Sequence, residues 1–143
     1  MMRPTAFFSL LLLCAALPAA AAGTVSGPVE TKVLRVVDGD TFVAEARVWP
    51  GHAVTVSVRI RGIDAPEIRS RCAAERAAAK KARAMLGRLL GDGPVTVSNI
   101  GGDKYYGRVL ADVTTADGTA IGPAMLRLGA ARAYGGKTRH KMC

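Results

Sequence analysis

The sequence has few of the residues that build the commonest catalytic and metal sites. It contains two histidines, His52 and His140, which fall in a turn and near the end of the chain, with no second histidine at ligand spacing. We therefore expect both to be solvated and neither to bind a metal or to act as a general base. Three cysteines occur, and none belongs to a recognisable Cys-His arrangement, which argues against a catalytic cysteine.

Long apolar runs are also missing, apart from one at the N-terminus. Residues 1–22 contain Arg3, an apolar stretch over residues 6–17, and a row of small residues that ends near Ala22. This three-part pattern predicts a secretory signal peptide, so that the chain would be secreted or periplasmic. Its removal would leave residues 23–143, a length that suits one modest domain.

Two other interpretations of the N-terminal segment are weaker. A transmembrane anchor would need about 20 apolar residues, more than this stretch provides. A lipid-modified Cys14 would need a small residue before it, whereas Leu13 precedes it. We expect cleavage between Ala19 and Gly23, and no attachment to the membrane afterwards.

Signal cleavage would leave two cysteines, Cys72 and Cys143. A chain sent to an oxidising compartment can join such a pair in a disulfide. The bond would tie the C-terminus to the middle of the chain and stabilise the fold by about 4 kcal/mol through restriction of the unfolded chain. The alternative is two unpaired thiols.

The sequence has no tract of one charge sign and no low-complexity tail after the leader. Without Arg3, 19 basic residues stand against 11 acidic ones, a net charge of +8. A small domain this basic attracts polyanions. Charge alone does not distinguish nucleic acid from acidic lipid or polysaccharide.

Hydrophobic patterning predicts a mainly β fold of the α+β class. Apolar alternation and turn residues indicate five strands and two helices, at residues 31–37, 42–49, 54–60, 71–90 (helix), 95–100, 108–114 and 123–129 (helix). This order fits a five-stranded oligonucleotide-binding (OB) barrel with one long and one short helix. The final residues, GGKTRHKMC, lack a core pattern and are expected on the surface.

Three charged clusters fall at the ends of predicted strands: DGDT at 38–41, RIRGIDAPE at 59–67 and DKYYGR at 103–108. Each alone has an ordinary explanation, since Asp-Gly is a leading hairpin-turn signal. Together they supply two aspartates, a glutamate and two arginines. Phosphodiester cleavage needs a cation held by carboxylates, a base for water, and donors for the charge that develops on phosphate. Arginine suits the last task because its planar fork stays protonated.

In these motifs the sequence resembles the staphylococcal nuclease, or thermonuclease, family. The resemblance covers residues 33–134 and comprises VVDGDT, R-x(4)-D-x-P-E, YGR and DG-x(10)-G. It implies a single thermonuclease-like OB domain over residues 23–143. It also implies calcium-dependent hydrolysis of DNA and RNA with low sequence specificity, and we expect the protein to act as a monomer.

The resemblance also implies roles for individual residues. Glu67 matches the glutamate proposed as general base, and Arg59 and Arg108 match two phosphate-binding arginines. The groups that match the calcium ligands are two carboxylates and one backbone carbonyl, those of Asp40, Asp64 and Ala65.

Three tyrosines are candidates for substrate binding. Tyr106 matches an aromatic residue of the nucleotide pocket, and Tyr105 takes the place of a lysine that often touches the terminal phosphate. Tyr134 is a candidate for stacking on a base. DKYYGR has one tyrosine more than the commoner DKYGR, which would displace Lys104. We expect no counterpart of the long C-terminal helix found in the best-known member of the family, and the Cys72–Cys143 bond would secure that end instead.

Two other functions remain open from the sequence. A catalytically silent nucleic-acid-binding module of the same family would more typically have lost Asp40, Arg59, Glu67 or Arg108, and all four are present. A basic envelope protein that binds acidic polysaccharide or lipid would explain the charge, but it would leave these residues unexplained.

Overall fold

Alternating apolar residues close five strands into a barrel. The computed structural model describes residues 23–139 and 142–143, so that the predicted signal peptide (1–22) and His140 lie outside the described residues. The barrel strands run in the order β1-β2-β3-β6-β5 around the closed sheet. Their bounds are β1 Val29–Val36, β2 Thr41–Trp49, β3 His52–Ile60, β5 Val95–Gly102 and β6 Arg108–Thr115.

The core fills the barrel and the space beneath it. Phe42, Val58, Ile60 and Val95 point inward from the strands and are completely buried. Neighbouring strands are antiparallel except β3 and β6, which run parallel with Arg59 opposite Leu110. This architecture is a closed, mainly β barrel with two helices, and it confirms the predicted fold class.

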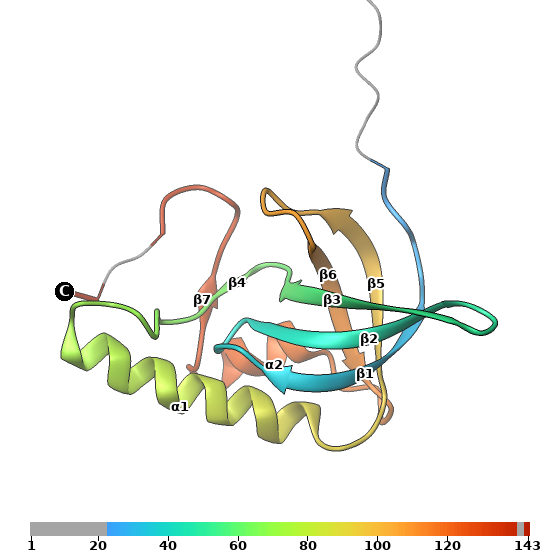
Figure 1. The fold of residues 1–143 in the computed structure, drawn as a ribbon. Coiled ribbons are helices and arrows are strands. Elements are labelled where there is room, and N and C mark those ends of the chain that lie inside the picture. The colour runs from blue at the N-terminus through green and yellow to red at the C-terminus, as the bar shows by residue number, and fades with distance from the viewer. Residues whose placement is uncertain (1–22, 140–141) are drawn as a thin grey trace, which may run out of the picture.

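Helix α1 (Ala73–Leu90) runs along one end of the barrel, with α2 (Ile121–Arg127) next to it (Figure 1). Cys72 caps α1, because its Sγ accepts the N–H of Glu75 at 3.4 Å. Helix α2 begins two residues before Pro123, whereas the sequence predicted a start at the proline. A proline fits here because the first N–H groups of a helix have no partner within it. Among the described residues no helix is long and apolar enough to cross a membrane.

A second, two-stranded sheet lies beside the barrel and was not predicted. Strand β4 (Ile63–Asp64) pairs antiparallel with β7 (Arg132–Ala133). Just beyond the pair, the N–H of Tyr134 donates to the carbonyl of Gly62 at 2.9 Å. The pairing places β7 beside β4 (Figure 1), with Arg132 opposite Asp64.

Candidate active site

The predicted charged residues come from separate elements and meet at one end of the barrel. Arg59 lies near the end of β3, Asp64 on β4, Glu67 in the loop before α1, and Arg108 at the start of β6. All four line a cleft of about 740 Å³. Asp40, in the turn between β1 and β2, is 1% exposed and lies against this cleft through its contact with Arg59.

The guanidinium of Arg59 bridges the two predicted metal carboxylates. Its Nη1 donates to Asp40 Oδ1 at 2.7 Å, and its Nη2 donates to Asp64 Oδ1 at 3.1 Å. The hydroxyl of Thr41 donates to the same Asp40 oxygen at 2.8 Å, and the N–H of Ala65 donates to Oδ2 at 2.9 Å. Burial lowers the pKa of Arg59, but the neighbouring carboxylates outweigh this and raise the pKa above its usual value.

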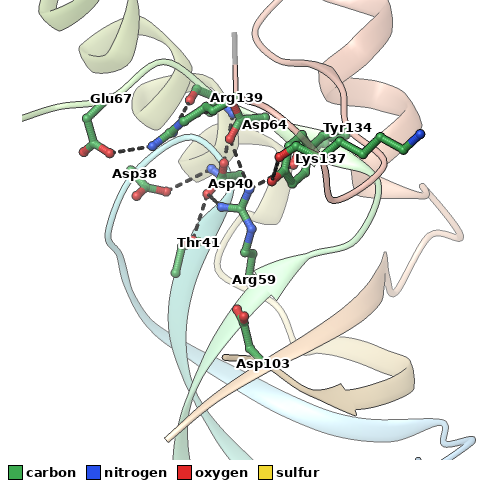
Figure 2. Close-up of polar contacts among 12 residues, drawn as sticks. Asp38, Asp40, Thr41, Arg59, Asp64, Glu67, Asp103, Tyr134, Lys137 and Arg139 are labelled. Atoms are coloured by element: carbon green, nitrogen blue, oxygen red, sulfur yellow. Dashed lines mark hydrogen bonds and ion pairs between the residues drawn. The ribbon is translucent and has the colours of Figure 1, made fainter. Parts of the chain in front are cut away.

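A second arginine, Arg139, occupies the other side of Asp64 (Figure 2). Its Nε donates to Asp64 Oδ2 at 3.1 Å, its Nη2 to the Ala65 carbonyl at 2.8 Å, and its Nη1 to Glu67 Oε2 at 2.7 Å. Burial opposes its charge, yet Asp64 and Glu67 raise the pKa of Arg139 above its usual value. The sequence placed this tail on the surface and missed Arg139, because no motif or periodicity marks it.

The loop that carries Glu67 is fixed by a buried carboxylate on α1. Glu75 is 7% exposed, and its Oε1 accepts the backbone N–H of Glu67 at 3.2 Å. Its Oε2 accepts the hydroxyl of Ser70 at 2.6 Å. The first turn of α1 therefore sets the path of the chain on which the predicted base is mounted.

Arg108 lies on β6, the strand next to that of Arg59, and its carboxylate partner is Asp103. Its Nε donates to Asp103 Oδ2 at 2.5 Å, and its guanidinium lies 4.4 Å from the centroid of the Tyr105 ring. Slight burial raises the pKa of Asp103, but the contact with Arg108 outweighs this effect and lowers the pKa below its usual value. Lys104, which the extra tyrosine was expected to displace, has its Nζ 5.1 Å from the centroid of the Tyr105 ring and also lines the cleft.

The three predicted substrate tyrosines differ in position. Tyr105 and Tyr134 line the cleft, and the guanidinium of Arg59 lies 5.8 Å from the Tyr134 ring centroid. The Tyr134 hydroxyl donates to the carbonyl of Lys137 at 2.9 Å. Tyr106 is fully exposed and does not line the cleft, so the geometry gives no support to its predicted role.

Asp38 is a site residue that the sequence treated only as part of a turn. It lines the cleft, and its Oδ1 accepts the N–H of Asp40 at 3.1 Å. Burial, and then the charges of Asp40 and Glu67, raise the pKa of Asp38 to about 6. The signal that could have revealed it is the spacing of DGDT, which puts two carboxylates on the same turn.

The oxygen atoms around Arg139 suit a hard cation such as calcium. Asp64, Ala65 and Glu67 offer two carboxylates and a carbonyl that already converge on one positive charge. Asp40 Oδ2 accepts a hydrogen bond from Ala65 and has capacity for a further partner. Within the described ranges no three acidic, histidine or cysteine side chains form a ready metal cluster.

The predicted cysteine pair lies at the edge of this region. Cys72 and Cys143 form a disulfide with their Cα atoms 6.0 Å apart, which fastens the C-terminus to the start of α1. His52 is exposed at the hairpin between β2 and β3, where its ring contacts the carbonyl of Pro50, and it does not line the cleft.

Comparison with known families gives one match. The model of the family described as staphylococcal nuclease homologue matches residues 57–142. No curated protein matches the chain. The matched range includes Arg59, Asp64, Glu67 and Arg108 but begins after Asp40, whose place in the site therefore depends on its contacts with Arg59 and Ala65.

Proposed function

The chain belongs to the staphylococcal nuclease homologue family, and from this premise we propose that it hydrolyses phosphodiester bonds of DNA and RNA with calcium as its cofactor. We also propose that it is exported and acts as a monomer with low sequence specificity. The proposal for export is based on the three-part leader at residues 1–22.

The observation that carries the catalytic proposal is the convergence of Arg59, Asp64, Glu67 and Arg108 on one cleft. They come from four separate elements, and Arg59 links the cleft to the buried Asp40. A charged surface that only attracts polyanions has no need for an arginine that bridges a buried carboxylate and a second one, as Arg59 bridges Asp40 and Asp64. The arrangement supports an enzyme more strongly than a general polyanion-binding surface.

The two cleft arginines suit the binding of a phosphodiester. Arg59 donates three hydrogen bonds, to Asp40, Ile63 and Asp64, which leaves two of its five N–H groups for phosphate oxygens. Arg108 offers a second guanidinium on the neighbouring strand, oriented by Asp103. Two guanidinium groups that hold the phosphate stabilise the charge that develops on it during attack by water.

Asp40, Asp64 and the Ala65 carbonyl would hold the calcium ion. When bound, calcium offsets negative charge on the phosphate. Glu67 accepts the proton that water loses as it attacks, and its N–H contact with Glu75 keeps its backbone in place. Tyr134 and Tyr105 line the cleft walls, where their rings can contact the nucleotide.

A cleavage assay tests the proposal. Purified mature protein is incubated with single-stranded DNA in calcium and in chelator, next to Glu67→Ala and Arg59→Ala. Arg83→Ala, on the exposed face of α1, controls for the loss of one positive charge. We expect calcium-dependent cleavage that both site variants lose and the control retains. Tight binding without cleavage in any metal would instead support the silent binding module.

A further inference from the structure

The C-terminal segment (residues 134–139 and 142–143) places a cation where the family resemblance puts the metal ion. The three groups that accept hydrogen bonds from Arg139 are Asp64, Ala65 and Glu67, at 3.1, 2.8 and 2.7 Å. Two of them are proposed calcium ligands and the third is the proposed base. As Figure 2 shows, the guanidinium lies directly between Glu67 and Asp64, so its position and that of a calcium ion exclude each other.

Anchors on both sides hold Arg139 near these oxygen atoms. Before it, β7 pairs with β4 and the Tyr134 N–H donates to Gly62. After it, Cys143 is bonded to Cys72, the residue that caps α1. A group tethered at two ends has a high effective concentration at its site, even when each contact is weak.

The contacts of Arg139 are nevertheless open to exchange. Its side chain is 42% exposed and that of Glu67 is 40% exposed, in contrast to 15% for Arg59. Ion pairs that water reaches contribute about 0–1 kcal/mol each, because the solvent screens them. A divalent cation with oxygen ligands can therefore displace Arg139, whereas Arg59 stays locked between Asp40 and Asp64.

We propose that Arg139 is an internal competitor of calcium and that the Cys72–Cys143 disulfide keeps it at the site. This inference rests on the proposed function, because it takes Asp64 and Ala65 as calcium ligands. A dithiol that reduces the bond transfers two electrons and two protons, gives two cysteine thiols, and becomes a disulfide itself. Arg139 then keeps only the anchor at β7, so the reduced protein binds calcium more tightly than the disulfide-bonded one.

Calorimetric titration of mature protein with calcium tests the competition without measuring cleavage. Arg139 makes one exposed contact, with Glu67, and two partly buried ones, with Asp64 and Ala65. Their loss, worth together about 1.4 kcal/mol, corresponds to a roughly tenfold lower Kd for Arg139→Ala. The matched control is Lys137→Ala, which removes the same charge from the same segment. The Lys137 side chain points away from the carboxylates in Figure 2, so we expect little change in its Kd.

Reduction tests the tether in the same titration. We expect a dithiol to lower the Kd of the natural sequence and to leave that of Arg139→Ala unchanged, because that variant has no competitor to release. Hydrogen exchange gives a second readout: calcium should speed exchange across residues 135–139 in the disulfide-bonded protein. Arg139→Gln, which removes the charge but keeps donors, replaces the alanine variant if that variant does not fold.

The outcomes separate this inference from the proposed function. Equal Kd values for the natural sequence and Arg139→Ala would overturn the competition while leaving the calcium site intact, as would an equal gain in Lys137→Ala. A gain in Arg139→Ala without any effect of reduction would overturn the tether. Absence of calcium binding in every form would overturn both the inference and the calcium dependence on which it rests.

Discussion

The buried carboxylate of Glu75 accepts the backbone N–H of Glu67 at 3.2 Å, so one acidic residue sets the position of another. Glu75 also accepts the hydroxyl of Ser70, and it is 7% exposed. The two carboxylates thus have different tasks: one is enclosed and holds a loop, and the other faces the cleft.

Replacement of Glu75 should therefore damage both stability and turnover. Glu75→Ala leaves the Glu67 N–H and the Ser70 hydroxyl without this partner, which we expect to cost about 1–3 kcal/mol in the free energy of unfolding. Urea denaturation measures the loss. Glu75→Gln keeps an acceptor for the Glu67 N–H and should retain more stability; an unchanged urea midpoint for Glu75→Ala would contradict the role.

Arg59 should prove important for folding as well as for cleavage. Arg59→Ala leaves Asp40 buried without its charge partner, and breaking a buried pair in this way typically costs about 3–5 kcal/mol. The loss should be largest in chelator and smaller in saturating calcium, since a cation would then neutralise Asp40 and Asp64. Thermal or urea unfolding under the two conditions checks this, and an equal loss in both would speak against a shared site.

Asp38 should make the metal-free protein less stable as the pH rises. Its pKa is about 6 in the folded protein against 3.8 for the unperturbed group, so the folded state holds the proton more tightly. The resulting stabilisation is present at low pH and is lost as the pH rises from about 4 through about 6. Asp38→Asn should therefore stabilise the protein in chelator at pH 7.5 by about 1–2 kcal/mol, less than the full shift because water reaches the carboxyl.

The pH dependence of this variant provides its own control. At about pH 3 and below, the aspartic acid is largely protonated in both states, so Asp38→Asn and the natural sequence should unfold at nearly the same urea concentration. A gain that persists unchanged at about pH 3 would show that the asparagine acts through packing instead of charge.

The disulfide should contribute to stability through the chain segment that it closes. Cys72 and Cys143 are 71 positions apart, and a link of this span is expected to contribute about 2–4 kcal/mol. Cys143→Ser and dithiol treatment should lower the urea midpoint to a similar extent. Mass measurement before and after reduction of protein from the periplasm or medium establishes the bond, and two free thiols there would reject it.

The barrel could be predicted from the sequence because its strands carry a strong local signal. Inward residues such as Val58 and Ile60 alternate with outward Ser57 and Arg59, and Gly-rich turns separate the runs. The two-residue strands β4 and β7 carry no such signal, since a period cannot be seen in two residues. Their pairing is determined by tertiary packing, which a local pattern does not contain.

The same distinction applies to the site. Arg59, Asp64 and Glu67 lie within nine residues and form a motif that can be seen in the sequence. The contacts of Arg139 join positions more than 70 residues apart in a tail without periodicity, so they become visible only once β7 has placed that tail. Asp38 was missed for another reason. A hairpin turn was a sufficient explanation for an aspartate in DGDT, and the raised pKa of Asp38 results from burial, which the sequence does not show.

The parallel pairing of β3 with β6 affects when the protein can become active during its synthesis. Arg59 lies on β3 and Arg108 on β6, and the chain passes through β4, α1 and β5 before these two strands can meet. A nascent chain that has just completed β3 carries Arg59 but not yet Arg108 on the neighbouring strand. The proposed cleavage of phosphodiesters would therefore become possible only when the barrel closes, which would leave an interval for the proposed export.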